Sequence, residues 1–435
     1  MDATSRWPAT IGRIGVARRD VTPPLGIFSG IWGAAAWERS TGQHASLELT
    51  ALSIAAGGMV QLIVSWDGVA WRRPEDEWAM RSAVLAATGL RPEHVVLQLS
   101  HTHAGPSLCP EDSVRAGGEH IERYLGALVS AAVDASREAI DTAVEGGILW
   151  GSGSSELAGV RDLPHGNRYV TGWNPNAEAD DTVLVGKAVS ADGGTLAVLA
   201  NFACHPTSLG WQNSLISPDF VGGLRAVVEE AVDAPCIYLQ GAEGNVAPRE
   251  QYSRDVALAD RHGRGLGHAV LAVLDALPGR LPARAGRPDE LAVHTDAATL
   301  RLKPVEDIPA LAARFWPELD PRTLDARVRR AQWRRRAVGA GAEAEFPVWV
   351  WRLGDAFLVA HPGEAYQEFQ QELRRRHPDS PILVLSLANG PIWTYFPTAD
   401  LFDDNLYQVW HTPFEAGGHE AMVELSDRVL EHLGA

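Results

Sequence analysis

The most informative stretch of this sequence is Val95-Val96-Leu97-Gln98-Leu99-Ser100-His101-Thr102-His103-Ala104-Gly105-Pro106. Its apolar, β-branched first half is typical of a buried strand, and Gly105-Pro106 indicates that the chain turns directly afterwards. Residues two apart in a strand point to the same face, so we expect His101 and His103 to project side by side. Such a pair suits metal binding, or one metal ligand beside a proton-transfer group. A polar strand end that reaches solvent is the simpler alternative.

Composition narrows the class of protein. The 435 residues, 46% hydrophobic and 21% charged, are typical of a globular protein with several average domains or one large α/β body. A formal net charge of −17 argues against nucleic acid and anionic membrane surfaces as partners. No apolar run has the length of a signal peptide or a membrane span. Three cysteines are an odd, sparse set that indicates reduced thiols. We therefore expect a cytoplasmic protein without a stable membrane anchor.

A hydrophobic pattern recurs three times along the chain. Each copy reads as a strand, a glycine-containing turn, a second strand, a polar loop, a helix, a third strand and a second polar loop. The copies run from residue 52 to 103, from 186 to 248 and from 348 to 395. They predict a mixed α/β (α+β) fold in which repeated strand-strand-helix-strand units form mixed sheets flanked by helices.

The repeat has a geometric consequence. If equivalent strands lie alongside one another, their terminal loops gather at one edge, where sites in α/β proteins are generally found. The pattern therefore brings together six residues that are distant in sequence: Asp67, His101, His103, His205, Glu364 and Tyr395.

The segments between the copies are read as connectors. Residues 121–143 and 254–277 have helical patterns, and the Pro-, Gly- and Arg-rich segment 278–288 is the best candidate for a surface link. Residues 306–338 are typical of a helical hairpin inserted before the third copy. Its basic run, Arg327 to Arg336 around Trp333, is interpreted as a solvated helix face. Since no boundary is evident, we expect one composite domain spanning residues 1–435.

The loop residues suit zinc chemistry. Catalytic zinc sites usually have three protein ligands, and two histidines with a glutamate are one such set, here His101, His205 and Glu364. His103 would then be free to hydrogen-bond the water or the oxyanion, and Asp67 could orient a histidine. The alternatives are that His205 caps a strand and that Glu364 is a carboxylate stabilised at a helix amino terminus.

A polar loop outside the repeat, residues 163–168, carries a candidate for substrate binding. Arg168 could clamp a carboxylate, carbonyl or phosphate. Equally, it could pair at the surface with Asp162, Asp180 or Asp181. The loop 241–248 resembles a phosphate cradle only superficially, because it lacks the Lys and Ser/Thr of a P-loop.

Taken together, the motifs resemble the amino-terminal catalytic domain of the neutral/alkaline non-lysosomal ceramidase family. The matching segments follow the family's order and cover most of the chain: 15–26, Ser100 to Pro106, 167–168, Asn201 to Thr207, 240–248, 362–364 and the loop around Tyr395. The resemblance implies hydrolysis of an N-acyl amide by water activated on one catalytic zinc ion. It also implies that His101, His205, Glu364 and Tyr395 hold the zinc, with His103 and Arg168 lining the site.

The sequence also departs from that family. No carboxy-terminal immunoglobulin-like domain and no export signal are seen, Ala247 stands where ceramidases usually carry serine, and the loop 402–405 differs. We therefore predict a cytoplasmic, bacterial-type, zinc-dependent amidohydrolase acting on a small-molecule amide, with lipid-like amides among the candidates. The catalytic residues would be His103, Tyr395, Arg168 and Asp67, and the substrate contacts Arg168, Asn167, Asn245 and Trp393.

Three alternatives stay open at this point. They are a genuine ceramidase acting on N-acylsphingosine, an ester or lactone hydrolase, and a metal-stabilised binding protein that has lost catalysis, which Ala247 suggests. A homo-oligomer is also compatible with the sequence.

Overall fold

The computed structural model describes residues 8–282, 291–304, 307–315, 317–390 and 394–435. All three predicted copies form, and each is preceded by one further strand. The first unit consists of β1 (Ala9–Asp20), β3 (Glu48–Ala56), β4 (Met59–Trp66), α1 (Pro74–Thr88) and β5 (Val95–Leu99). The second consists of β6 (Val144–Ser154), β10 (Thr182–Ser190), β11 (Thr195–Phe202), α3 (Phe220–Val232) and β13 (Cys236–Gln240). The third consists of β15 (Leu291–Arg301), β16 (Glu343–Leu353), β17 (Ala356–Ala360), α7 (Gln367–Arg376) and β19 (Ile382–Leu385).

Strand pairing is the same in all three units. The first three strands are antiparallel neighbours, and the last strand is parallel to the third because a helix carries the chain back across the sheet. An antiparallel pairing of β1 with β6 joins the first two units into one sheet with the order β13-β11-β10-β6-β1-β3-β4-β5. The third unit forms a separate sheet with the order β15-β16-β17-β19.

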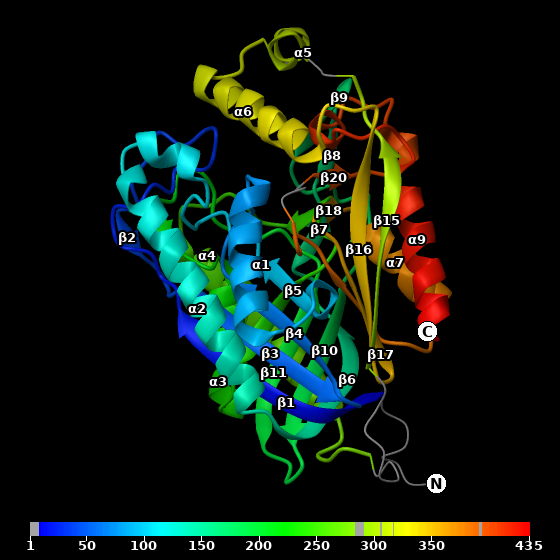
Figure 1. Cartoon of the computed structure of the whole chain (residues 1–435). Helices are drawn as coiled ribbons and strands as arrows, with labels where there is room; N and C mark the ends of the chain where they lie inside the picture. Colours follow the sequence, from blue (N-terminus) through cyan, green and yellow to red (C-terminus); the bar gives the residue numbers. More distant parts are fainter. Residues whose placement is uncertain (1–7, 283–290, 305–306, 316, 391–393) are drawn as a thin grey trace.

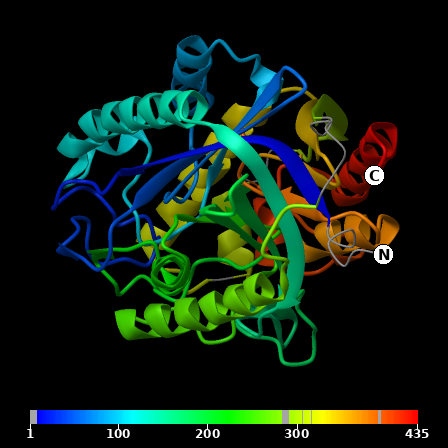
Figure 2. The same ribbon diagram turned by 90° about the horizontal axis from the view of Figure 1, so that it is seen from below.

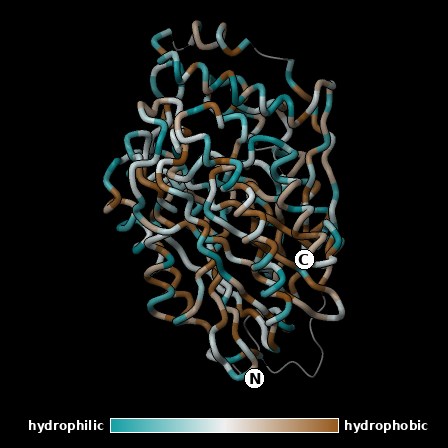
Figure 3. The backbone as a smooth tube through the Cα atoms, turned by 60° about the vertical axis from the view of Figure 1, so that its left-hand side comes forward, coloured by the Kyte–Doolittle hydropathy of each residue, from teal (hydrophilic) through white to brown (hydrophobic). Residues whose placement is uncertain are grey.

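The two sheets face each other between layers of helices (Figures 1 and 2). Helices α1 and α2 (Ile121–Asp141) cover one half of the outer face of the large sheet, and α3 and α4 (Val256–Ala276) cover the other half. Helices α7 and α9 (Gly418–Leu433) cover the far face of the small sheet. Strand alternation explains the layers, since Leu62 and Val64 face the helices whereas Ile63 faces the second sheet. Figure 3 shows hydrophobic segments concentrated in this interior.

The remaining strands and helices are short, apart from the 18-residue helix α6. They are β2 (Gly42–Gln43), β7 (Ala158–Val160), β8 (Asp162–His165), β9 (Arg168–Thr171), β12 (Leu215–Ile216), β14 (Val246–Pro248), β18 (Glu364–Ala365), β20 (Tyr395–Phe396), α5 (Ile308–Phe315), α6 (Pro321–Val338) and α8 (Tyr407–His411). Helices α5 and α6 confirm the predicted helical segment and lie at the upper end in Figure 1.

Two further sequence expectations concern the whole chain. In the part of the chain that the structure describes, no helix combines the length and apolarity needed to cross a bilayer. Cys109, Cys204 and Cys236 are buried and unpaired, in agreement with the expected reduced thiols.

Candidate metal centre

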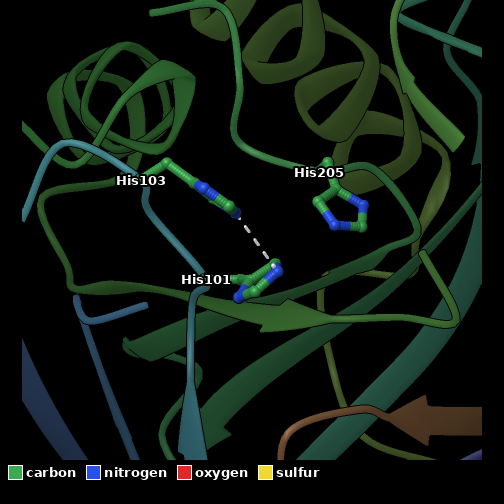
Figure 4. A group of neighbouring side chains, drawn as sticks. All are labelled: His101, His103 and His205. Atoms are coloured by element: carbon green, nitrogen blue, oxygen red, sulfur yellow. Dashed lines mark hydrogen bonds between the residues drawn. The ribbon is translucent and has the colours of Figure 1, made fainter. Parts of the chain in front are cut away.

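Three histidines converge at the end of the sandwich (Figure 4). Strand β5 ends at Leu99, and His101 adopts a left-handed backbone conformation with φ of +70°. The expected side-by-side placement of His101 and His103 therefore arises from a turn and not from strand alternation. Their Nε2 atoms lie 3.4 Å apart. His205 enters from the loop after β11, and its ring centroid is 4.8 Å from that of His101.

Main-chain carbonyl groups fix the rings of two of these histidines. The Nδ1 atom of His101 lies 2.5 Å from the carbonyl oxygen of Val69, and that of His205 lies 2.7 Å from the carbonyl oxygen of Glu243. A carbonyl oxygen only accepts hydrogen bonds, so both Nδ1 atoms carry the proton. The Nε2 lone pairs of His101 and His205 therefore point into the centre.

Glu364 on β18 faces these two lone pairs. Its Oε2 atom lies 3.1 Å from Nε2 of His205 and 3.4 Å from Nε2 of His101. Its Oε1 atom is buried and has no hydrogen-bond partner among the described residues. Strand β18 pairs in parallel with β20, which sets Glu364 beside Tyr395. The Tyr395 ring stacks on His205 with centroids 6.4 Å apart.

This donor set fits a divalent cation. Two imidazole lone pairs and a carboxylate oxygen at 3.1–3.4 Å would repel one another unless a positive charge lies between them. Ligand atoms bound tetrahedrally to zinc at about 2.0–2.1 Å are themselves about 3.4 Å apart. Burial, and then the charge of Arg161, lowers the pKa of His205 to about 3, so that its imidazole is neutral as a ligand must be.

The pKa values of His103 and Glu364 are also shifted toward the protonation states that suit metal binding. Burial lowers the pKa of His103 well below its usual value, and the neighbouring imidazoles of His101 and His205 lower it further. Burial alone would raise the pKa of Glu364, but interactions with His101 and His205 outweigh it and hold that pKa well below the usual value. Neutral imidazoles and an ionised carboxylate are the forms that coordinate zinc.

Sequence reasoning missed Glu243, which follows β13. One carboxylate oxygen of Glu243 forms a second group of potential ligands with His101 and Glu364, all within 4.8 Å of one another. Burial and the charge of Glu364 raise the pKa of Glu243 well above its usual value. The sequence pattern could have identified Glu243, because it follows the last strand of the second unit, as His101 follows the last strand of the first.

The structure assigns Asp67 a different neighbour from the one expected. Its carboxylate oxygens lie 2.5 and 3.1 Å from the two terminal nitrogens of Arg225, and it also accepts a hydrogen bond from the amide of Glu48. The prediction that Asp67 orients a histidine is therefore wrong, because the Val69 carbonyl holds His101 instead.

A different arginine from the one predicted reaches the centre. The β8–β9 hairpin carries Asn167, which is exposed, and Arg168, which is half-buried. Arg161, just before this hairpin, lines the cavity in front of the histidines and lies over the Tyr395 ring at 5.4 Å. A hydrogen bond to the Gly244 carbonyl fixes it at 2.8 Å.

Asn245 and Trp393 are the other two residues predicted to contact the substrate. Asn245 is buried, accepts a hydrogen bond from the amide of Gln367 and donates one to Glu368, so it ties its own loop to the first turn of α7 and does not present its amide to a substrate. Trp393 lies outside the described residues.

The cavity in front of the histidines has a volume of about 330 Å³. It opens between the metal ligands and helix α6, and aromatic side chains form much of its wall. His103 lies at its edge, where the indole of Trp32 covers the imidazole with ring centroids 4.8 Å apart. The lining includes Trp32, Val69, Arg72, His101, His103, Arg161, Trp211, Tyr252, Arg327, Arg330, Glu364, Tyr395 and Tyr407.

The basic run on α6 is therefore not the solvated face that the sequence suggested. Arg327 and Arg330 line the cavity, and Arg334 is buried with a terminal nitrogen 2.6 Å from Nδ1 of His411. Helix α6 lies against the end of the sandwich (Figure 1), so these three side chains lie in the cavity wall or the interior, whereas Arg336 is exposed.

Comparisons with known proteins agree with the fold. The crystal structure of neutral ceramidase from Pseudomonas aeruginosa superposes with a TM-score of 0.71 at 17% sequence identity, covering 98% of this chain and 75% of that chain. A structure described as ceramidase complexed with C2 gives a TM-score of 0.70 at 16% identity, with 98% and 76% covered. No protein-family model and no curated protein matches the sequence. The chain therefore has the neutral ceramidase fold, and the resemblance seen in the motifs is confirmed at this level.

Proposed function

We propose that this protein is a zinc-dependent hydrolase that cleaves the C–N bond of a small-molecule amide. The observation that carries the proposal is the convergence of two imidazole lone pairs and a carboxylate on one point, each from a different four-stranded unit. His101, His205 and Glu364 would hold the ion, with the adjacent Tyr395 as the fourth protein ligand or as a hydrogen-bond donor. Zinc, when bound, acidifies a water molecule and polarises a carbonyl group.

The chain's own side chains supply the remaining functions. His103 is neutral, lies at the cavity edge and can take a proton from the nucleophile and return it to the leaving amine. Burial raises the pKa of Tyr395, as does the charge of Glu364, so its phenol stays protonated and can donate to the oxyanion. Arg161, buried beside Tyr395, supplies a fixed positive charge to the same oxyanion.

Metal analysis with an activity panel tests this function. We expect about one zinc per chain in the purified protein, and loss of both zinc and amide hydrolysis in His101→Ala and His205→Ala. His120→Ala, which changes a half-buried histidine that is not among the residues lining the cavity, should retain both. Stoichiometric zinc in both ligand variants would exclude this site.

N-acylsphingosine is a second candidate substrate, because the similar structures are ceramidases. Turnover of detergent-dispersed ceramide, with little activity on soluble amides, would support it. The cavity of about 330 Å³ lies at the lower end of the range of about 300–1,000 Å³ for small-molecule sites and so favours a smaller amide. Preferential cleavage of esters or lactones would instead identify an ester hydrolase. A zinc-loaded protein inactive on the whole panel would be a binding protein.

A further inference from the structure

The cavity in front of the metal centre is strongly cationic. Four arginines line it, namely Arg72, Arg161, Arg327 and Arg330. Among the described residues of the lining, Glu364 supplies the one carboxylate, and it faces the metal ligands. A bound divalent cation would add to this positive charge. The contrast with the rest of the chain is large, because the protein as a whole carries a formal net charge of −17.

Neutral groups contact the guanidinium groups of Arg330 and Arg327. Arg330 donates to the carbonyl oxygen of Ile31 at 2.9 Å and to the hydroxyl of Tyr407 at 3.3 Å. Arg327 lies over the rings of Tyr407 and Trp410 at 5.6 and 6.0 Å. These partners orient the two guanidinium groups and carry no negative charge.

Arg72 lies over the ring of Trp333 at 5.6 Å, and the charge of Asp112 also acts on it. Its burial, and then the positive charge of Arg330, lowers its pKa to about 9. Arg72, Arg327 and Arg330 line the same cavity, where their like charges repel one another. An anion that enters between them would relieve this repulsion.

From this arrangement we propose that the substrate is an anionic small amide, one that carries a carboxylate or a similar oxyanion in addition to its scissile bond. Planar guanidinium groups bind such oxyanions through two parallel hydrogen bonds. The aromatic side chains of Trp32, Trp211 and Tyr252 provide an apolar surface for the rest of the molecule. This inference rests on the proposed amide hydrolase function and assigns its substrate class. It also implies that α6, which follows β15 and precedes β16 in the sequence, contributes the arginines that select the substrate.

Matched pairs of soluble amides test the inference on the zinc-loaded protein. N-benzoylglycine and N-benzoylethanolamine differ in a carboxylate on the amine side, and N-succinylbenzylamine and N-butyrylbenzylamine differ in one on the acyl side. We expect kcat/KM to be about tenfold or more higher for at least one anionic member, the gain from one charge-assisted hydrogen bond. This preference should shrink as salt is added, because ions screen the attraction.

Variants of α6 show whether its arginines carry the preference. Arg330→Gln and Arg327→Gln should each reduce the ratio of anionic to neutral kcat/KM about tenfold, mainly through a higher KM for the anionic amide. Arg322→Gln is the matched control, since Arg322 lies on the same helix, is exposed and pairs with Asp320. Calorimetric titration of the zinc-loaded protein with N-benzoylglycine should show the same ranking in Kd.

The outcomes separate this inference from the proposed function. Hydrolysis of the neutral amides as efficiently as both anionic ones would overturn the anionic substrate class while supporting an amide hydrolase. An unchanged ratio in both arginine variants would also overturn it. Inactivity on all four amides and on a broader amide panel would instead contradict the proposed function itself.

Discussion

The two histidines that we propose as metal ligands are oriented by the main-chain carbonyl groups of Val69 and Glu243. Sequence analysis could predict these histidines, because each follows a recognisable strand. It could not predict what orients them, since every residue has a carbonyl group and only the folded loops decide which one points to an imidazole. Asp67 looked suited to that task from its position alone, and the structure gives it Arg225 instead.

The Asp67–Arg225 pair is buried, so we expect Asp67→Ala to destabilise the protein without removing the metal. Loss of Asp67 leaves the buried Arg225 with only the more distant carboxylate of Glu48, at 3.6 Å, and should cost up to about 3–5 kcal/mol in the free energy of unfolding. Urea unfolding and zinc analysis of the same preparation measure both quantities. The double variant Asp67→Ala/Arg225→Met should recover part of the stability. A loss of zinc from the folded Asp67→Ala protein would show that Asp67 supports the metal centre after all.

His361 is expected to make the protein less stable in acid. Burial lowers its pKa to about 3, and the charge of His419 contributes, whereas in the unfolded chain the pKa is about 6.5. Between these values the unfolded chain binds a proton that the native protein does not. The free energy of unfolding should therefore fall by about 1.4 kcal/mol for each pH unit from about pH 6.5 down to about pH 3.

The variant His361→Leu tests this pH dependence. It should show a shallower decline of the unfolding free energy, by about one proton, in urea titrations at several pH values. The half-buried His120 serves as a control, since His120→Leu should leave the slope of unfolding free energy against pH unchanged. Equal slopes for His361→Leu and the natural sequence would contradict the prediction.

At the scale of elements, the threefold hydrophobic pattern predicted most of the architecture. Alternating apolar residues and glycine turns specified the hairpins of all three units, and the parallel last strand followed from the helix that precedes it. The extra strands β1, β6 and β15 were harder to assign to units, because long connections separate them from the hairpins they join. The role of α6 was misjudged, because a basic helix reads the same from sequence whether its arginines face solvent or a cavity.

Two glycines of α4 provide a matched pair of substitutions, since one faces α3 and the other does not. At Gly263 an added methyl group would come within 2.1 Å of the carbonyl oxygen of Phe220 and 2.6 Å of the Cα atom of Gly223, both of them backbone atoms. Gly263→Ala should therefore push α4 away from α3 and lower the free energy of unfolding by about 1–3 kcal/mol.

Gly265 lies on the same helix with nothing within 4 Å of the added methyl group. Gly265→Ala should therefore raise the free energy of unfolding by up to about 1 kcal/mol, because alanine favours the helix. Denaturant titrations of both variants make the comparison. Similar effects of the two substitutions would show that the helices do not depend on this close contact.

At the scale of the whole molecule, the candidate site joins parts of the chain that the sheets leave separate. His101 and His205 extend from two units of the large sheet, and Glu364 extends from the unit that forms the small sheet. The sequence predicted this convergence from the repeat alone. It did not predict the surrounding charge, because Arg161 and the arginines of α6 lie outside the repeat and become neighbours only when the insertion folds over the cavity.

A metal bound by all three units should stabilise the entire fold. Because the unfolded chain lacks the preformed site, a free metal concentration 100 times Kd contributes about 2.7 kcal/mol to the free energy of unfolding. A chelator should lower the unfolding temperature of the natural protein, and added zinc should restore it. His205→Ala should show almost no response to either treatment, because it lacks a central ligand, whereas His120→Ala should respond like the natural protein. If chelation removes zinc without lowering the unfolding temperature, the metal does not link the three units, and the two sheets are held together by their apolar interface alone.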